Sequence, residues 1–84
     1  MENTTLPHIT LIAAIIGTHF NQTLSLMTAA NHLESLKVCS ELAITVYKVL
    51  EPDLIGYGDI TYLDNVVNKT KEILNNDYNI RLFP

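Results

Sequence analysis

Histidine and cysteine are the side chains of this sequence best suited to acid–base, nucleophilic or metal chemistry, and there are few of them. The chain contains His8, His19, His32 and one cysteine, Cys39. His8 and His19 are separated by three helical turns, or about 16 Å along a helix axis, so they cannot share one metal ion. The sequence lacks the H-x-x-x-H and C-x-x-C spacings that paired metal ligands show. We therefore expect no metal site, no cofactor and no catalytic residue.

Two of these side chains fit structural roles better than chemical ones. A nucleophilic Cys39 would need a neighbouring base, and His32 precedes it by about two helical turns. We therefore predict that Cys39 is a small apolar residue of the core. His19 falls on an apolar helical stripe together with Gln22. We interpret these two as a possible buried polar site, hydrogen-bonded across an interface, rather than as ligands or catalytic groups.

A twelve-residue loop that begins at Asp53 resembles the calcium-binding loop of the EF-hand family. Gly58 stands at the place of the family's turn glycine, and Asp64 closes the loop. The resemblance implies calcium held by side-chain oxygens, but Ile55 and Tyr57 stand where the family supplies two of those oxygens. We therefore predict an ordinary glycine-rich turn between two helices, without a bound cation.

The C-terminal tail resembles the short peptide that partners of bacterial sliding clamps insert into the clamp. Ile80, Leu82 and Phe83 match the aliphatic and Leu-Phe positions, whereas Asn79 replaces a glutamine and Arg81 replaces a small or acidic spacer. The resemblance implies a replication regulator that acts through its tail. The alternative is that Leu82 and Phe83 fold back and anchor the end of the chain on the helices.

Aromatic residues near the loop add to the candidates for a contact surface. Tyr57 and Tyr62 lie on or beside a predicted exposed turn, where tyrosines are effective interface residues; packing over the ends of the helices is the alternative. Together with the tail, the predicted partner-binding residues are Tyr57, Tyr62, Ile80, Arg81, Leu82 and Phe83.

Composition limits the class of protein. The 84 residues correspond to one domain, 48% of them are hydrophobic and 17% are charged, and the net charge is −4. The five lysines and arginines are scattered, which argues against nucleic acid and against anionic membrane surfaces, since both need clustered cations. A single cysteine favours a reducing compartment, so we predict a cytoplasmic protein.

The N-terminal part of the sequence is almost free of charge. No Asp, Glu, Lys or Arg occurs between Glu2 and Glu34, although a surface helix normally carries charge on its outer face. The uninterrupted apolar run, residues 11–16, is much shorter than the roughly 20 residues of a membrane span. We therefore expect this segment to be buried inside the protein or in an interface, and we predict no membrane association.

The elements that would position these residues are helices. We predict a helix at about 7–30, a second at about 32–50 that begins with a capping box at Asn31 and Glu34, a loop at 51–59, a third helix at about 60–75 and an extended tail at 76–84. Because no glycine or proline enforces a stop near residue 31, one helix continuing to residue 50 is the alternative.

The first predicted helix carries two apolar stripes. Two stripes indicate burial on two sides, and three short helices would not easily cover both. The fold expected is thus an all-α, single-domain, three-helix unit with a long apolar first helix, which packs as a homodimer or larger oligomer. The predicted self-association residues are Ile12, Ile16, Phe20, Leu24, Leu26 and Met27.

For function, the sequence favours a non-enzymatic protein-interaction module. A small acidic chain with excess apolar helix surface is typical of adaptors and of inhibitors of the phage or immunity type, which act by covering a protein target; this is an analogy of size and fold. One alternative is a helical bundle that binds a small ligand with His19, Asn21 and Gln22 as polar groups in an apolar cavity. The other is the clamp-directed regulator implied by the tail.

Overall fold

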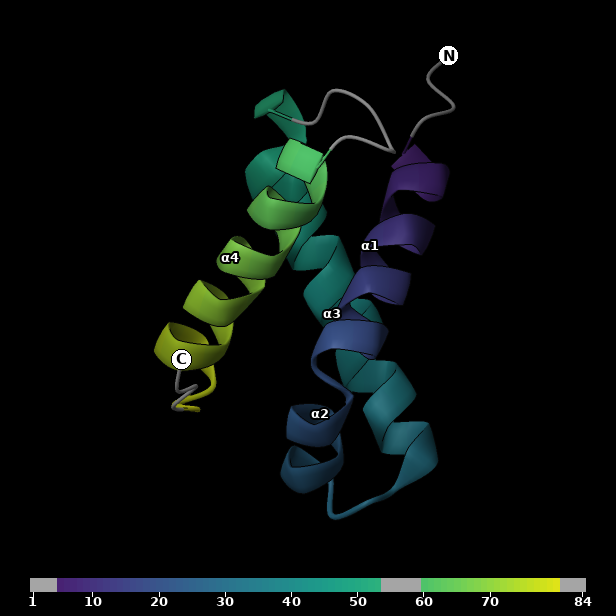
Figure 1. Cartoon of the computed structure of the whole chain (residues 1–84). Helices are drawn as coiled ribbons and strands as arrows, with labels where there is room; N and C mark the ends of the chain where they lie inside the picture. Colours follow the sequence, from purple (N-terminus) through teal and green to yellow (C-terminus); the bar gives the residue numbers. More distant parts are fainter. Residues whose placement is uncertain (1–4, 54–59, 81–84) are drawn as a thin grey trace.

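The computed structural model describes residues 5–53 and 60–80, and all regular structure in these residues is helical. The elements are α1 (Thr5–His19), α2 (Asn21–Met27), α3 (His32–Leu50), the short 3₁₀ turn η1 (Glu51–Asp53) and α4 (Ile60–Asp77) (Figure 1). The predicted all-α fold is confirmed. The second predicted helix has the bounds of α3, and α4 extends two residues beyond the predicted end of the third.

α3 is the central helix of the arrangement. It contacts α1, α2 and α4, and α1 also contacts α4. α1 and α4 lie against the same side of α3, and α2 lies beside the N-terminal end of α3 (Figure 1). The described molecule measures 39 × 27 × 20 Å along its principal axes.

The first predicted helix is not continuous, which corrects the sequence-based prediction. The chain bends by 81° between α1 and α2 at Phe20, whose backbone angles (φ −123°, ψ 23°) depart from a regular helix. The Phe20 side chain is buried, so the bend occurs where this ring enters the core. Because of the bend, α2 packs beside the N-terminal end of α3, and Ile12, Ile16, Phe20 and Leu24 are buried within a single chain.

The turn after α2 has the geometry of a Schellman motif, although it contains no glycine. The amide of Ala30 donates to the carbonyl of Ser25 (2.8 Å), and the amide of Ala29 donates to that of Leu26 (3.4 Å). Ala29 and Ala30 have φ values of 53° and 64°, in the left-handed region that normally favours glycine at this place. These hydrogen bonds satisfy the last carbonyls of α2 and end the helix.

The start of α3 was readable from the sequence. Asn31 is the N-cap residue, and its side-chain oxygen accepts a hydrogen bond from the amide of Glu34 at 3.0 Å. The hydroxyl of Thr28 also lies 2.7 Å from that of Ser35, which ties the turn to the first part of α3. The predicted boundary at Asn31 is therefore confirmed, and the alternative of one helix continuing to residue 50 is wrong.

The core lies between α1, α3 and α4, with α2 closing one end. Its largest fully buried side chains are Ile12, Ile16, Leu42, Val46, Val66, Thr70 and Leu74. The hydroxyl of Thr70 is satisfied by donating to the carbonyl of Val66 at 2.7 Å. Val66, Thr70, Ile73 and Leu74 recur at the three- and four-residue spacing of one helical face, as an amphipathic helix requires.

Candidate functional site

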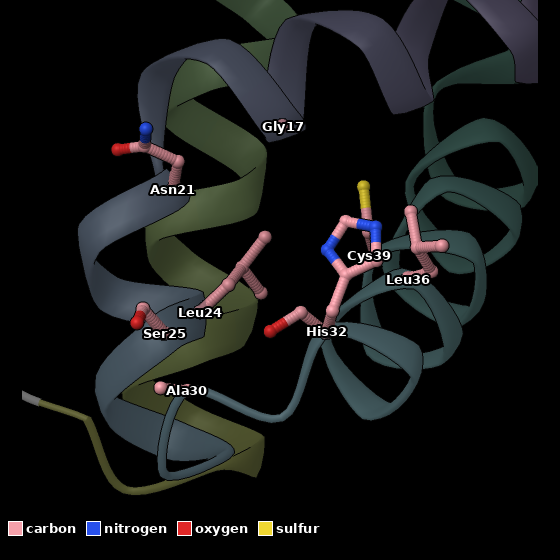
Figure 2. A pocket seen from close by; sticks show the side chains of 9 residues that line it. Gly17, Asn21, Leu24, Ser25, Ala30, His32, Leu36 and Cys39 are labelled. Carbon is pink, nitrogen blue, oxygen red and sulfur yellow. The ribbon is translucent and has the colours of Figure 1, made fainter.

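A pocket of about 270 Å³ lies where α1, α2 and the first half of α3 meet (Figure 2). The chain bends by 81° after α1, so α2 lies at an angle beside the N-terminal part of α3, and the pocket is the space that these helices enclose. The residues that line it are Gly17, Asn21, Leu24, Ser25, Ala30, His32, Ser35, Leu36 and Cys39. Its volume is slightly below the usual range of about 300–1,000 Å³ for small-molecule sites.

Apolar groups line one part of this pocket. Leu24 extends from α2 toward the space between α2 and α3 (Figure 2) and is buried, whereas Leu36 on α3 is 52% exposed. Gly17 contributes no side chain, and a Cβ atom at this position would lie 4.0 Å from the sulfur of Cys39. The absence of a side chain at Gly17 thus keeps the α1 side of the pocket open.

Hydrogen-bonding groups form the rest of the lining. Asn21 and Ser25 come from α2, and His32 and Ser35 come from α3. Asn21, Ser25 and His32 are exposed, while Ser35 is half-buried. An apolar region edged by a few polar side chains can bury one apolar group and still hydrogen-bond the polar atoms beside it.

Cys39 borders the pocket but belongs to the core, as the sequence predicted. Its thiol donates a hydrogen bond to the carbonyl oxygen of Ala13 on α1, with a sulfur–oxygen distance of 3.3 Å. Burial raises the pKa of this thiol above its usual value, and the protonated form is a poor nucleophile. Cys39 therefore joins α1 to α3 and is not chemically activated.

A second polar cluster lies where the first turns of α1 meet the C-terminal half of α3 and the start of α4, and sequence reasoning missed it. Nδ1 of His8 lies 2.8 Å from the hydroxyl of Tyr62, with the two rings nearly parallel (17°) and their centroids 5.6 Å apart. The ring of Tyr47 is 5.9 Å from that of His8, and its hydroxyl lies 3.2 Å from that of Thr5. The spacing of His8 four residues before the buried Ile12 was the available signal.

A shallow hollow of about 540 Å³ runs along the outer face of α3. Apart from Asn31, the cap residue of the helix, it is lined only by α3, through Leu33, Glu34, Leu36, Lys37, Ser40, Glu41 and Ile44. Leu33 is 77% exposed and Ile44 is 41% exposed. We call these α3 residues the outer face of α3. It combines large apolar and charged side chains on a surface that no other described element covers.

Most of the predicted self-association residues lie elsewhere than expected. Ile12, Ile16, Phe20 and Leu24 are buried in the core of the single chain, and Met27 packs partly buried against it. Leu26 is 84% exposed. The bend after α1 is the physical reason, because it lets α3 and α4 cover a stripe that a straight helix would have left for a partner.

The predicted buried polar site is not present within the chain. His19 is the last residue of α1, Gln22 lies on α2, and both side chains are exposed. Since the bend separates them, they no longer share one helical stripe. Neither lines the pocket; of the three polar residues expected in an apolar cavity, Asn21 alone does so. The buried histidine of this molecule is His8.

The candidates for partner binding divide between two regions. Tyr62 is buried and bonded to His8, so the prediction that it is an exposed contact residue is wrong. Ile80 is half-buried against the core, and its amide donates to the carbonyl of Leu74 at 2.9 Å. Tyr57, Arg81, Leu82 and Phe83 lie outside the described residues, as do residues 54–59, which are half of the EF-hand-like loop, and the last three residues of the clamp-type motif.

In residues 5–53 and 60–80, no group of three or more His, Cys, Asp or Glu residues is placed to hold a metal ion. No single helix among them is long and apolar enough to cross a bilayer. α1 and α2 pass such a test only when taken together, and they are bent by 81° relative to each other.

Comparison with known proteins adds no assignment for these sites. The chain matches no protein-family model, no curated protein and no solved structure.

Proposed function

We propose that this chain is a non-catalytic protein-interaction module, an adaptor or inhibitor, that binds a protein partner through the pocket between α1, α2 and α3. The observation that carries the proposal is an open pocket with an apolar region beside exposed leucines. Leu36 lines the pocket, and Leu26 and Leu33 adjoin lining residues in the sequence on either side of the α2–α3 turn. Protein interfaces draw much of their affinity from one large side chain buried in such a pocket.

The size and polarity of the pocket indicate what the partner presents. A volume of about 270 Å³ suits a single aliphatic or aromatic side chain better than a drug-sized ligand. Asn21, Ser25 and Ser35 could bond the backbone groups on either side of that side chain. The net charge of −4 favours a neutral or basic partner surface.

The state of Cys39 also supports a binding role. Cys39 lines the pocket, but burial raises the pKa of its thiol, and the thiol donates a hydrogen bond to the carbonyl oxygen of Ala13. A catalytic cysteine needs the opposite condition, namely a lowered thiol pKa.

The test uses a matched pair of variants on α2. Ser25→Arg places a long charged side chain at the pocket, whereas Gln22→Arg adds the same charge on the same short helix at an exposed residue outside the lining. Proteins retained by the immobilised parent chain from an extract of its source cells would be identified and purified, and their dissociation constants measured with all three chains.

The proposal predicts a purified partner that binds the parent and Gln22→Arg equally and Ser25→Arg at least about tenfold more weakly, since the buried anchor residue carries most of the affinity. Equal binding to all three chains would exclude the pocket as the interface. Helical content of the three chains, measured by circular dichroism, controls for unfolding.

A second candidate function rests on the same pocket. Its polar lining, which includes Asn21 and His32, could instead orient a small molecule of fragment size. A small ligand of this site would raise the melting temperature of the parent and of Gln22→Arg, but not that of Ser25→Arg. A screen of fragment-sized compounds that gives no such differential shift would leave only the protein partner.

A further inference from the structure

A self-complementary pattern of charges follows the outer face of α3 and continues to Lys48. Glu34, Lys37, Glu41 and Lys48 are all exposed, and their spacings of three, four and seven residues place them in one row along the helix. Their signs alternate from negative to positive twice. Within residues 5–53 and 60–80, none of the four forms an ion pair.

Beside this row lies an apolar strip with a small residue at its centre. Leu33, Leu36 and Ile44 are exposed on it, and Ser40 lies midway between Leu36 and Ile44. Helix axes approach to about 8–10 Å when the residues at the crossing are small enough. Ser40 therefore marks a point where a second helix could pack closely on α3.

We infer that the outer face of α3 pairs with the same face of a second copy of this chain, antiparallel and about a twofold axis close to Ser40. A twofold axis makes an interface in which each residue meets its symmetry-related counterpart. Leu36 lies four residues before Ser40 and Ile44 four residues after it, so Leu36 of one copy lies opposite Ile44 of the other. The apolar strip is buried along its length.

The same axis matches the charges. Lys37 comes within about two residues, or roughly 3 Å along the helix, of the position opposite Glu41 of the second copy. Glu34 of one copy likewise comes within roughly 3 Å along the helix of the position opposite Lys48 of the other. All four lie on one edge of the strip, and a twofold axis brings that edge against the same edge of the second copy. A parallel pair needs a twofold axis along the helices, which would bring the charged edge against the opposite edge of the second copy. The antiparallel arrangement is therefore the one that pairs these charges.

A single helix pair limits the strength of this dimer. It buries less than the roughly 1,200–2,000 Å² of a stable interface, so we expect association in the micromolar range or weaker. The mass of the parent should therefore be measured by light scattering or sedimentation up to about 500 µM, a range chosen to cover weak complexes.

Charge reversal tests both the interface and its orientation. Lys37→Glu and Glu41→Lys should each weaken dimerisation several-fold, because each places like charges together twice in the symmetric dimer. The double variant Lys37→Glu/Glu41→Lys restores opposite charges and should dimerise like the parent. An equimolar mixture of the two single variants should form a heterodimer that is more stable than the homodimer of either variant, because its opposite charges face each other.

Two further variants separate loss of pairing from loss of fold. Ser40→Arg should raise the dissociation constant by more than about tenfold, since it places two bulky charges at the crossing point. Ile60→Arg adds the same side chain at an exposed residue of α4 and should change nothing. A parent that stays monomeric at 500 µM, or a dimer indifferent to Ser40→Arg and to the charge reversals, would overturn the inference. The substituted residues lie outside the pocket lining, so this result leaves the Ser25→Arg test of the proposed function unaffected.

Discussion

At the scale of single residues, the buried thiol of Cys39 makes the stability of the fold depend on pH. Its pKa is raised above the usual 9.0 by burial, so the folded chain keeps this proton at a pH where the unfolded chain loses it. The contribution of Cys39 to stability is therefore complete below about pH 9 and is lost as pH rises through the raised value. Tyr78 acts in the same direction above its usual 10.0, because burial, and then the charges of Glu41 and Asp77, raise its pKa.

This argument predicts that the free energy of unfolding falls as pH rises above about 9, and that Cys39→Ala flattens the first part of the fall. Urea unfolding of the parent and the variant between about pH 8 and pH 9.5 measures both slopes below the range where Tyr78 contributes. The variant also loses the bond to Ala13, so its stability is lower throughout and the slope is the informative quantity. Equal slopes in the two proteins would contradict the assignment.

At the scale of elements, the ends of α2 and α3 follow different rules. Asn31 caps α3 through its side chain, which a sequence pattern can reveal. The end of α2 depends instead on the left-handed conformation of Ala29 and Ala30. Alanine is unfavourable there by about 1–2 kcal/mol per residue in a left-handed helix, and tertiary packing must compensate. No sequence rule identifies an alanine as a stop signal.

This contrast predicts that the same substitution, alanine to glycine, has opposite effects on stability at the end of α2 and inside α1. Ala29→Gly should stabilise the chain by about 0.5–1 kcal/mol, because glycine adopts a positive φ at no steric cost. Ala14→Gly, at an exposed position inside α1, should destabilise it by about the same amount. Urea unfolding of both variants against the parent measures the difference, and a destabilising effect of Ala29→Gly would contradict the left-handed geometry of the turn.

The bend between α1 and α2 could not be predicted from the sequence because, like the end of α2, it depends on tertiary packing. The prediction treated residues 7–30 as one straight helix and assigned mainly the stripe with Ile12, Ile16, Phe20 and Leu24 to a partner, whereas these four side chains are buried within the chain. The 81° bend at Phe20 is decided by long-range packing against α3, which local propensity does not report. The site depends on that bend, and for this reason the pocket could not be predicted from spacing alone.

At the scale of the whole molecule, the charge-free segment contributes one side of the core through Ile12, Ile16, Phe20 and Leu24, and large apolar side chains are exposed on α3 and beside the pocket. Burial inside the domain, one of the possibilities for this segment, accounts for Ile12 and Ile16. Leu33, Leu36 and Ile44 are exposed on the outer face of α3. The sequence analysis did not identify this apolar surface because charged residues lie between the apolar ones. Both proposals follow from this difference: most side chains predicted to form an interface are buried in the chain, whereas apolar side chains on α3 and beside the pocket are exposed.

The most direct test of this account compares the free energies of unfolding of the variants Ile16→Asp and Leu26→Asp. The sequence analysis assigned both residues to one self-association interface. Ile16 is 0% exposed, so an aspartate there buries an unpaired charge at a cost comparable to the whole stability of a small domain, about 5 kcal/mol or more. Leu26 is 84% exposed, and its replacement should change stability by no more than about 0.5 kcal/mol. A chain that unfolds with Ile16→Asp and stays folded with Leu26→Asp is the predicted result, whereas a stable Ile16→Asp would contradict the account.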